Sequence, residues 1–136
     1  MVTYVLDASA ILRYLDREAG FDRVSQIING HLAGLDRVVM SAVHCGEVAG
    51  VICRNHGRAT VDLALARLFA FGFEIVPATA ERAIRAALIK VERNIPYADA
   101  FGVELASGSP EHVLVTADFD LKAATRDVKI EFLPKK

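Results

Sequence analysis

The chain has 136 residues, a length that fits one domain, 1–136. It contains 16 Lys and Arg and 17 Asp and Glu, so its formal net charge is −1. An apolar fraction of 53% and a mean hydropathy of +0.31 exclude a disordered chain, and the near-neutral charge argues against a protein that coats DNA. The longest stretch without a formal charge, Val24–Leu35, is shorter than the ~18 residues of a membrane span, and Met1–Leu6 lacks the basic lead of a signal peptide, so we expect a cytoplasmic protein with no membrane contact.

Apolar periodicity and capping residues divide the chain into short strands and helices. In chain order the predicted elements are a strand over Val2–Leu6, helices over Ala10–Leu15 and Phe21–Leu32, a strand over Val38–Met40, helices over Ala42–Arg54 and Ala59–Phe71, a strand over Glu74–Val76, helices over Ala80–Arg93 and from Pro96 to about Ser107, a strand over Val113–Thr116, a helical turn over Leu121–Ala124 and a strand over Lys129–Phe132. Ser9, Ser41 and Thr79 precede helices as predicted N-caps. Because the strands are short, apolar throughout and separated by helices, the pattern predicts an α/β fold with a short central parallel sheet and helices on both faces.

Acidic residues follow two of the predicted strands. Asp7 comes directly after the first strand, and Asp118 and Asp120 come just after the fourth. Ligands of open α/β sheets bind outside the carboxyl ends of the strands, so Asp7 and Asp118 face one crevice if their strands are neighbours. The alternatives are that Asp7 only caps a helix and that Asp118 and Asp120 form an ordinary turn.

Two further carboxylates stand in predicted helices. Glu47 lies in a helix that is apolar on nearly all sides, so it must reach solvent, pair with a base or bind a metal. It would be an ordinary exposed residue if it shares a narrow polar stripe with His44 and Arg54. Asp99 lies in the first turn of a helix, where the helix dipole alone favours a carboxylate. Clustered carboxylates without His or Cys suit hard cations such as Mg²⁺ or Mn²⁺, which typically assist displacement at phosphorus.

The motifs of other site types are absent. Cys45 and Cys53 lie about 12 Å apart along the predicted helix, too far for a disulfide, so we expect free thiols in a reducing compartment. The four histidines are dispersed, and each is expected at the surface or at a helix end. The sequence has neither a glycine-rich phosphate-binding loop nor a nucleophile elbow.

The acidic residues fall within four characteristic segments: Val5–Leu12, Met40–Val48, Ile95–Phe101 and Leu114–Leu121. In this order and at this spacing, the segments resemble the motifs of the PIN-domain ribonucleases, and within that family the VapC-type toxins of toxin–antitoxin pairs. The resemblance covers essentially the whole chain and implies a single PIN-like domain. Ala8 stands where many members have Thr, and Tyr97 where a small or polar residue is common, but neither departure removes a carboxylate.

The resemblance also implies an activity, a cofactor and partners. It implies an endoribonuclease that uses Mg²⁺ or Mn²⁺, leaves a 5′-phosphate and a 3′-hydroxyl, and forms a homodimer. Its cognate VapB-type antitoxin would place a C-terminal segment across the active-site groove. The implied metal ligands and catalytic residues are Asp7, Glu47, Asp99 and Asp118, supported by the hydroxyls of Ser9 and Thr116 and by Asp120 as a frequent fifth acid.

RNA must also be held at such a site. Lys122 and Arg126 follow Asp118 closely and are candidates for contacts with RNA phosphates, although both could equally belong to a solvated face. Three other functions stay open at this point: a PIN-type RNA-processing nuclease without an antitoxin, a non-catalytic PIN domain that binds RNA or protein, and a metal-dependent phosphatase for small phosphoesters.

Overall fold

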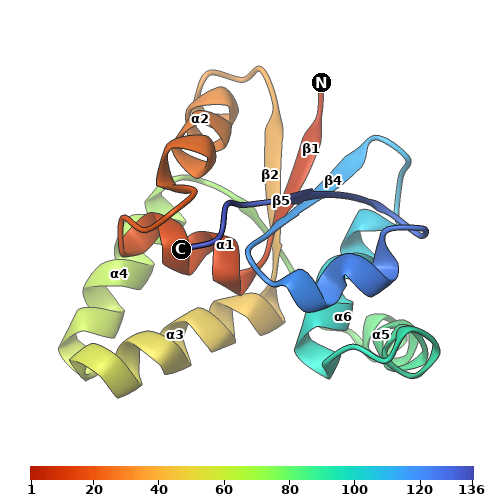
Figure 1. Ribbon diagram of the computed structural model, residues 1–136. Helices are drawn as coiled ribbons and strands as arrows, with labels where there is room; N and C mark the ends of the chain where they lie inside the picture. The colour runs from red at the N-terminus through yellow and green to blue at the C-terminus, as the bar shows by residue number, and fades with distance from the viewer.

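The computed structural model describes residues 1–136 as a parallel sheet of five strands with helices on both faces (Figure 1). In chain order the elements are β1 (Thr3–Leu6), α1 (Ala8–Leu15), α2 (Phe21–Leu32), β2 (Arg37–Ser41), α3 (Ala42–His56), α4 (Arg58–Ala70), β3 (Glu74–Val76), α5 (Ala80–Arg93), α6 (Tyr97–Ala106), β4 (His112–Thr116), the 3₁₀-helix η1 (Phe119–Ala124) and β5 (Lys129–Phe132). The predicted α/β class is confirmed. No helix combines the length and hydrophobicity needed to cross a bilayer.

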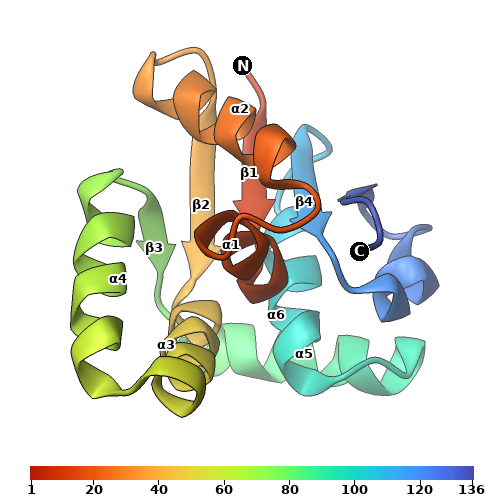
Figure 2. The ribbon, with the colours of Figure 1, turned by 60° about the vertical axis from the view of Figure 1, so that its left-hand side comes forward.

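The strands lie in the order β3-β2-β1-β4-β5, with β1 in the centre. Val5 of β1 pairs with Val39 of β2 on one side and with Leu114 of β4 on the other, and every pairing is parallel. The chain builds the sheet outward from β1 through β2 and β3, then returns to add β4 and β5 on the other side. The direction of winding therefore reverses between β1 and β4, which is where open α/β sheets bind their ligands. Figure 2 shows β1, β2, β3 and β4 pointing toward the same edge of the sheet.

Side chains that alternate along the strands form a hydrophobic core on each face of the sheet. Leu6 and Val115 belong to the core under α1, α2, α3 and α4, whereas Val5 and Leu114 belong to the core under α5, α6 and η1. All four side chains are fully buried. Because both faces of β1 and β4 are covered, the uniformly apolar strands of the sequence are explained.

Two local expectations differ from the structure. The N-cap of α1 is Asp7 and not Ser9, because Asp7 Oδ1 accepts the Ala10 N–H at 3.0 Å. The helix α3 is less buried than its apolar sequence predicts, since only His44, Val48 and Ile52 lie in the interior. Both cysteines are free, as expected.

Candidate active site

The first strand delivers Asp7 to the sheet edge in a fixed orientation. Its side chain is only 3% exposed, and Oδ1 accepts hydrogen bonds from the Ala10 N–H at 3.0 Å and the Ser9 hydroxyl at 2.7 Å. Both bonds use Oδ1 and leave Oδ2 for a ligand. Asp7 therefore caps a helix, as the alternative interpretation held, and also presents an oxygen at the crevice.

A chain of hydrogen bonds connects Asp7 with Asp118 across the two central strands. The Asp118 N–H donates to Thr116 Oγ1 at 3.0 Å, and Thr116 Oγ1 lies 3.2 Å from Ser9 Oγ. Because Ser9 gives its only proton to Asp7, the Thr116 hydroxyl donates in this contact. Ser9 Oγ also accepts the Ala117 N–H at 2.8 Å. The two predicted supporting hydroxyls thus lock the end of β4 to the end of β1.

Asp118 lies half-buried at the start of η1. Its Oδ1 accepts the Asp120 N–H at 2.9 Å, which makes it the N-cap of this helix. Asp120 is exposed, and its backbone rather than its carboxylate contacts Asp118. The structure therefore brings Asp118 to the site and leaves the predicted fifth acid at the rim.

Asp99 carries the strongest electrostatic signature of the site. It lies half-buried in the first turn of α6, and its Oδ2 is buried without a hydrogen-bond partner. Burial is the largest cause that raises the Asp99 pKa to about 8, followed by the close side chain and negative charge of Asp118 and by the charges of Asp7 and Glu47. The four predicted carboxylates therefore lie within electrostatic reach of one another.

Glu47 lies at the solvent side of this group. Its side chain is 41% exposed. Burial raises the Glu47 pKa, and the charges of Asp7 and Asp118 raise it further, whereas His44 lowers it. Glu47 therefore reaches solvent, which is one of the roles that the sequence left open, and it also lies close to the other acids.

His44 is a site residue that the sequence interpretation missed, since it is buried and not at the surface. Its Nε2 lies 2.9 Å from the carbonyl oxygen of Ala98 and 3.9 Å from Glu47 Oε1. A carbonyl can only accept, so Nε2 carries the proton and His44 ties α3 to the turn that presents Asp99. The signal was its place three residues before Glu47, which puts both side chains on one face of a helix.

The site offers the donors of a hard divalent cation. In the present side-chain positions, no three of its residues are close enough together to hold one metal ion. The donors are nevertheless all carboxylate oxygens, and one of them is the buried and unpartnered Asp99 Oδ2. Burial and then the acidic neighbours raise the pKa of Asp99. A bound Mg²⁺ or Mn²⁺ would satisfy that oxygen and offset the repulsion, so the residues fit such an ion.

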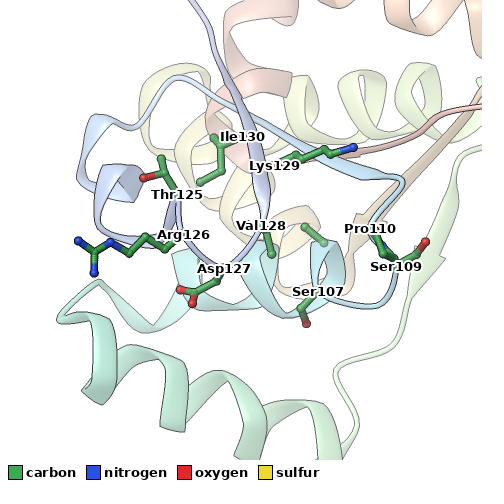
Figure 3. A pocket seen from close by; sticks show the side chains of 10 residues that line it. Ser107, Ser109, Pro110, Thr125, Arg126, Asp127, Val128, Lys129 and Ile130 are labelled. Carbon is green, nitrogen blue, oxygen red and sulfur yellow. The ribbon is translucent and has the colours of Figure 1, made fainter.

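The two predicted RNA contacts lie in different places. Lys122 is exposed on η1, where its ammonium lies over the ring of Phe119, the neighbour of Asp118. Arg126 lies in the turn before β5 and lines a separate cavity of about 510 Å³ opposite Ser107 and Ser109 (Figure 3). That cavity contains none of the four carboxylates. Lys122 therefore lies beside Asp118, whereas Arg126 lines a different cavity from the one that Asp118 lines.

Comparison with known proteins identifies the fold. The PIN domain family model matches residues 4–127. The chain is similar to a solved VapBC2 from Rickettsia felis bound to a promoter DNA fragment, with 12% identity, a TM-score of 0.73 and coverage of 97% of this chain and 99% of that one. It is also similar to a DNA-bound VapBC from Salmonella typhimurium (19%, TM-score 0.69, 97% and 98% covered) and to Mycobacterium tuberculosis VapC20, a sarcin–ricin loop cleaving toxin (17%, TM-score 0.68, 96% and 99% covered). No protein of curated function matches the chain.

Proposed function

Because the chain belongs to the PIN domain family, we propose that it is a Mg²⁺- or Mn²⁺-dependent endoribonuclease that hydrolyses RNA phosphodiesters. The observation that carries this proposal is the half-buried Asp99, whose Oδ2 has no hydrogen-bond partner and whose pKa is raised to about 8, first by burial and then by the neighbouring acids. Such an arrangement is costly unless a cation occupies it, and perturbed carboxylates of this kind cluster at catalytic sites.

Asp7, Glu47, Asp99 and Asp118 would hold the ion. When bound, a divalent cation lowers the pKa of a water molecule and stabilises negative charge on the phosphate oxygens. The chain's own part is to fix the ligands: Ser9 and Thr116 orient Asp7 and the end of β4, and His44 holds the turn of Asp99. These hydrogen bonds limit the movement of the carboxylates and so keep the site preorganised.

We also propose that the enzyme is the toxin of a VapBC-type pair, acting in the cytoplasm as a homodimer with a cognate antitoxin. The support is the shared fold with structures named as VapBC complexes and with a toxin that cleaves the sarcin–ricin loop. Expression of the chain alone should arrest growth, and co-expression of the antitoxin encoded beside it should restore growth. Growth that continues during expression of an active nuclease would instead favour an RNA-processing enzyme.

The activity itself is tested with purified protein and structured RNA, with and without Mg²⁺ or Mn²⁺. We expect cleavage only with metal, and none by the Asp99→Asn variant. Absence of cleavage together with no metal-induced rise in Tm would contradict the nuclease and favour a PIN domain that only binds. Turnover of a simple phosphomonoester instead of RNA would favour a phosphatase.

A further inference from the structure

The aromatic ring of Phe119 is fixed directly beside the acidic site. Phe119 follows Asp118 in the chain and stacks on Phe132 of β5, with ring centroids 5.4 Å apart and planes inclined by 12°. Because Phe132 belongs to the sheet and pairs with Thr116, the position of the Phe119 ring is defined by the central architecture and not by the loop alone.

Two lysines from different parts of the chain converge on this ring. The Nζ atoms of Lys122, on η1, and of Lys135, after β5, lie 5.3 Å and 5.1 Å from the centroid of Phe119. Both side chains are exposed and neither forms an ion pair, whereas Arg23, Arg82 and Arg93 are each paired with a carboxylate. The ring attracts each ammonium through its quadrupole, but the two positive charges repel each other. An anion bound between them would remove that repulsion.

The segment that carries Lys135 is anchored on both sides. Arg13 donates to the carbonyl oxygen of Pro134 at 2.8 Å, and Lys136 forms an ion pair with Glu18. Lys135 lies between these two anchors, so its ammonium is presented over Phe119 at a small entropic cost. Its position is therefore built by contacts to α1 and to the turn after α1.

Phe119 and Asp118 also line one polar cavity of about 490 Å³, which runs along α1 and α3. Its charged lining residues are Arg13, Asp16, Glu18 and Lys136, besides Asp118. Arg13 donates to two backbone carbonyls and Lys136 is paired with Glu18, so the unpaired positive charge at this place comes from the two lysines over Phe119.

We propose that Lys122 and Lys135, held over Phe119, bind a backbone phosphate of the RNA strand next to the scissile bond. The inference rests on the proposed function and adds the side from which the substrate approaches. Two unpaired ammonium groups held at one aromatic ring favour a phosphate as their ligand. A cation bound at the carboxylates would reduce their repulsion of that phosphate.

The test measures binding of a fluorescent structured RNA by anisotropy between 50 and 300 mM salt. All proteins carry Asp99→Asn, which prevents cleavage. The double variant Lys122→Ala/Lys135→Ala should bind about tenfold more weakly at low salt, and its plot of log affinity against log salt should be shallower by about 0.7 to 1.4. The double Lys→Arg variant should keep the parent's slope. Lys90→Ala, which removes an exposed and unpaired lysine of α5, is the matched control and should bind as the parent does.

Phe119→Leu tests the ring separately, because it keeps both lysines but removes the surface that aligns them. It should weaken RNA binding two- to fivefold, and Phe119→Tyr should restore it. A double alanine variant that binds RNA like its parent in the Asp99→Asn background, and that cleaves RNA like its parent when Asp99 is restored, would overturn the lysine site alone. A parent enzyme that never cleaves RNA would overturn the proposed function, and this inference with it.

Discussion

Replacement of Asp99 by Asn should stabilise the metal-free protein while it abolishes nuclease activity. Most substitutions of half-buried residues destabilise a protein, so a gain in stability is a specific consequence of the site's electrostatics. Asn is nearly isosteric with Asp, keeps an oxygen in the position of the carboxylate and cannot ionise. The variant therefore removes the repulsion by Asp118, Asp7 and Glu47 without leaving a cavity.

The magnitude follows from the pKa of Asp99, which rises from 3.8 to about 8 on folding. At ~1.4 kcal/mol for each pKa unit the upper limit is ~6 kcal/mol, and solvent screening of a half-buried carboxyl reduces it to about 1–2 kcal/mol. Because the folded-state pKa is raised, the stability associated with protonated Asp99 is fully present below pH ~4 and is lost as the pH rises through about 8. The advantage of the variant should therefore be small at pH 4 to 5 and largest above pH 8.

Thermal and urea unfolding in EDTA at pH 5, 7 and 9 measure this effect. At pH 9 the Tm of Asp99→Asn should exceed that of the parent by about 5 °C. Addition of Mg²⁺ should raise the Tm of the parent and have little effect on the variant, so that the difference shrinks or reverses. Asp62→Asn, at an exposed position on α4, is the matched control and should leave the Tm unchanged at each pH.

A variant that is less stable than the parent at pH 9 in EDTA would refute the reasoning, because it would show that ionised Asp99 is not a source of strain. A difference in Tm that does not vary with pH would refute it as well, since only a titrating group produces the predicted slope.

Three further predictions concern the surroundings of the site. Gly102→Ala should lower the free energy of unfolding, measured by urea denaturation, by about 1 kcal/mol, because the new Cβ would lie 3.1 Å from a methyl of Leu114. This clash should outweigh the better helix propensity of Ala, and unchanged stability would mean that the packing is loose. Ser9→Ala should reduce RNA cleavage about 10- to 100-fold and lower the Tm by a few degrees, because it breaks the hydrogen-bond chain between Asp7 and Thr116 and leaves the Ala117 N–H without its acceptor. Glu104→Gln should destabilise the fold by about 2 kcal/mol and leave kcat unchanged at low temperature, because it disrupts the ion pairs that hold α5 on α6; a loss of kcat would link that pairing to the chemistry.

The order of the elements and the position of Asp7 and Asp118 could be predicted from the sequence because both are local properties. Strand ends follow from where apolar runs stop, and a carboxylate just after such a run must lie at the sheet edge. That the strands of these two residues are neighbours could not be derived in this way, because strand order depends on contacts across more than 100 residues. The structure supplies it through the pairing of β1 with β4.

The roles of His44, Lys135 and Arg126 depended on packing that the sequence does not reveal. From the sequence alone, His44 fitted an exposed polar stripe with Glu47 as well as a buried position. Its contact with the Ala98 carbonyl of α6 shows that it is buried. Lys135 lies beyond β5 in the chain, and its ammonium reaches the ring of Phe119 because β5 returns beside β4. Arg126 is close to Asp118 in sequence yet lies in another cavity, because a short 3₁₀-helix reverses the direction of the chain. Sequence distance was therefore a poor guide to distance at this edge of the sheet.

Glu104 and Asp99 lie on the same helix, yet one carboxylate is compensated within the fold and the other, a proposed metal ligand, is not. Glu104 is more deeply buried, but Arg82 and Arg85 both contact it, at 2.8 Å and 3.0 Å, so its charge is compensated within the fold. Asp99 lies one and a half turns earlier in α6, has no basic partner, and is surrounded by other acids. A sequence that needed Asp99 only for folding could place an uncharged residue there and gain stability. A site that receives its positive charge from a bound cation requires a carboxylate without a basic partner in the protein. Asp99 is such a carboxylate, whereas Glu104 on the same helix is fully compensated.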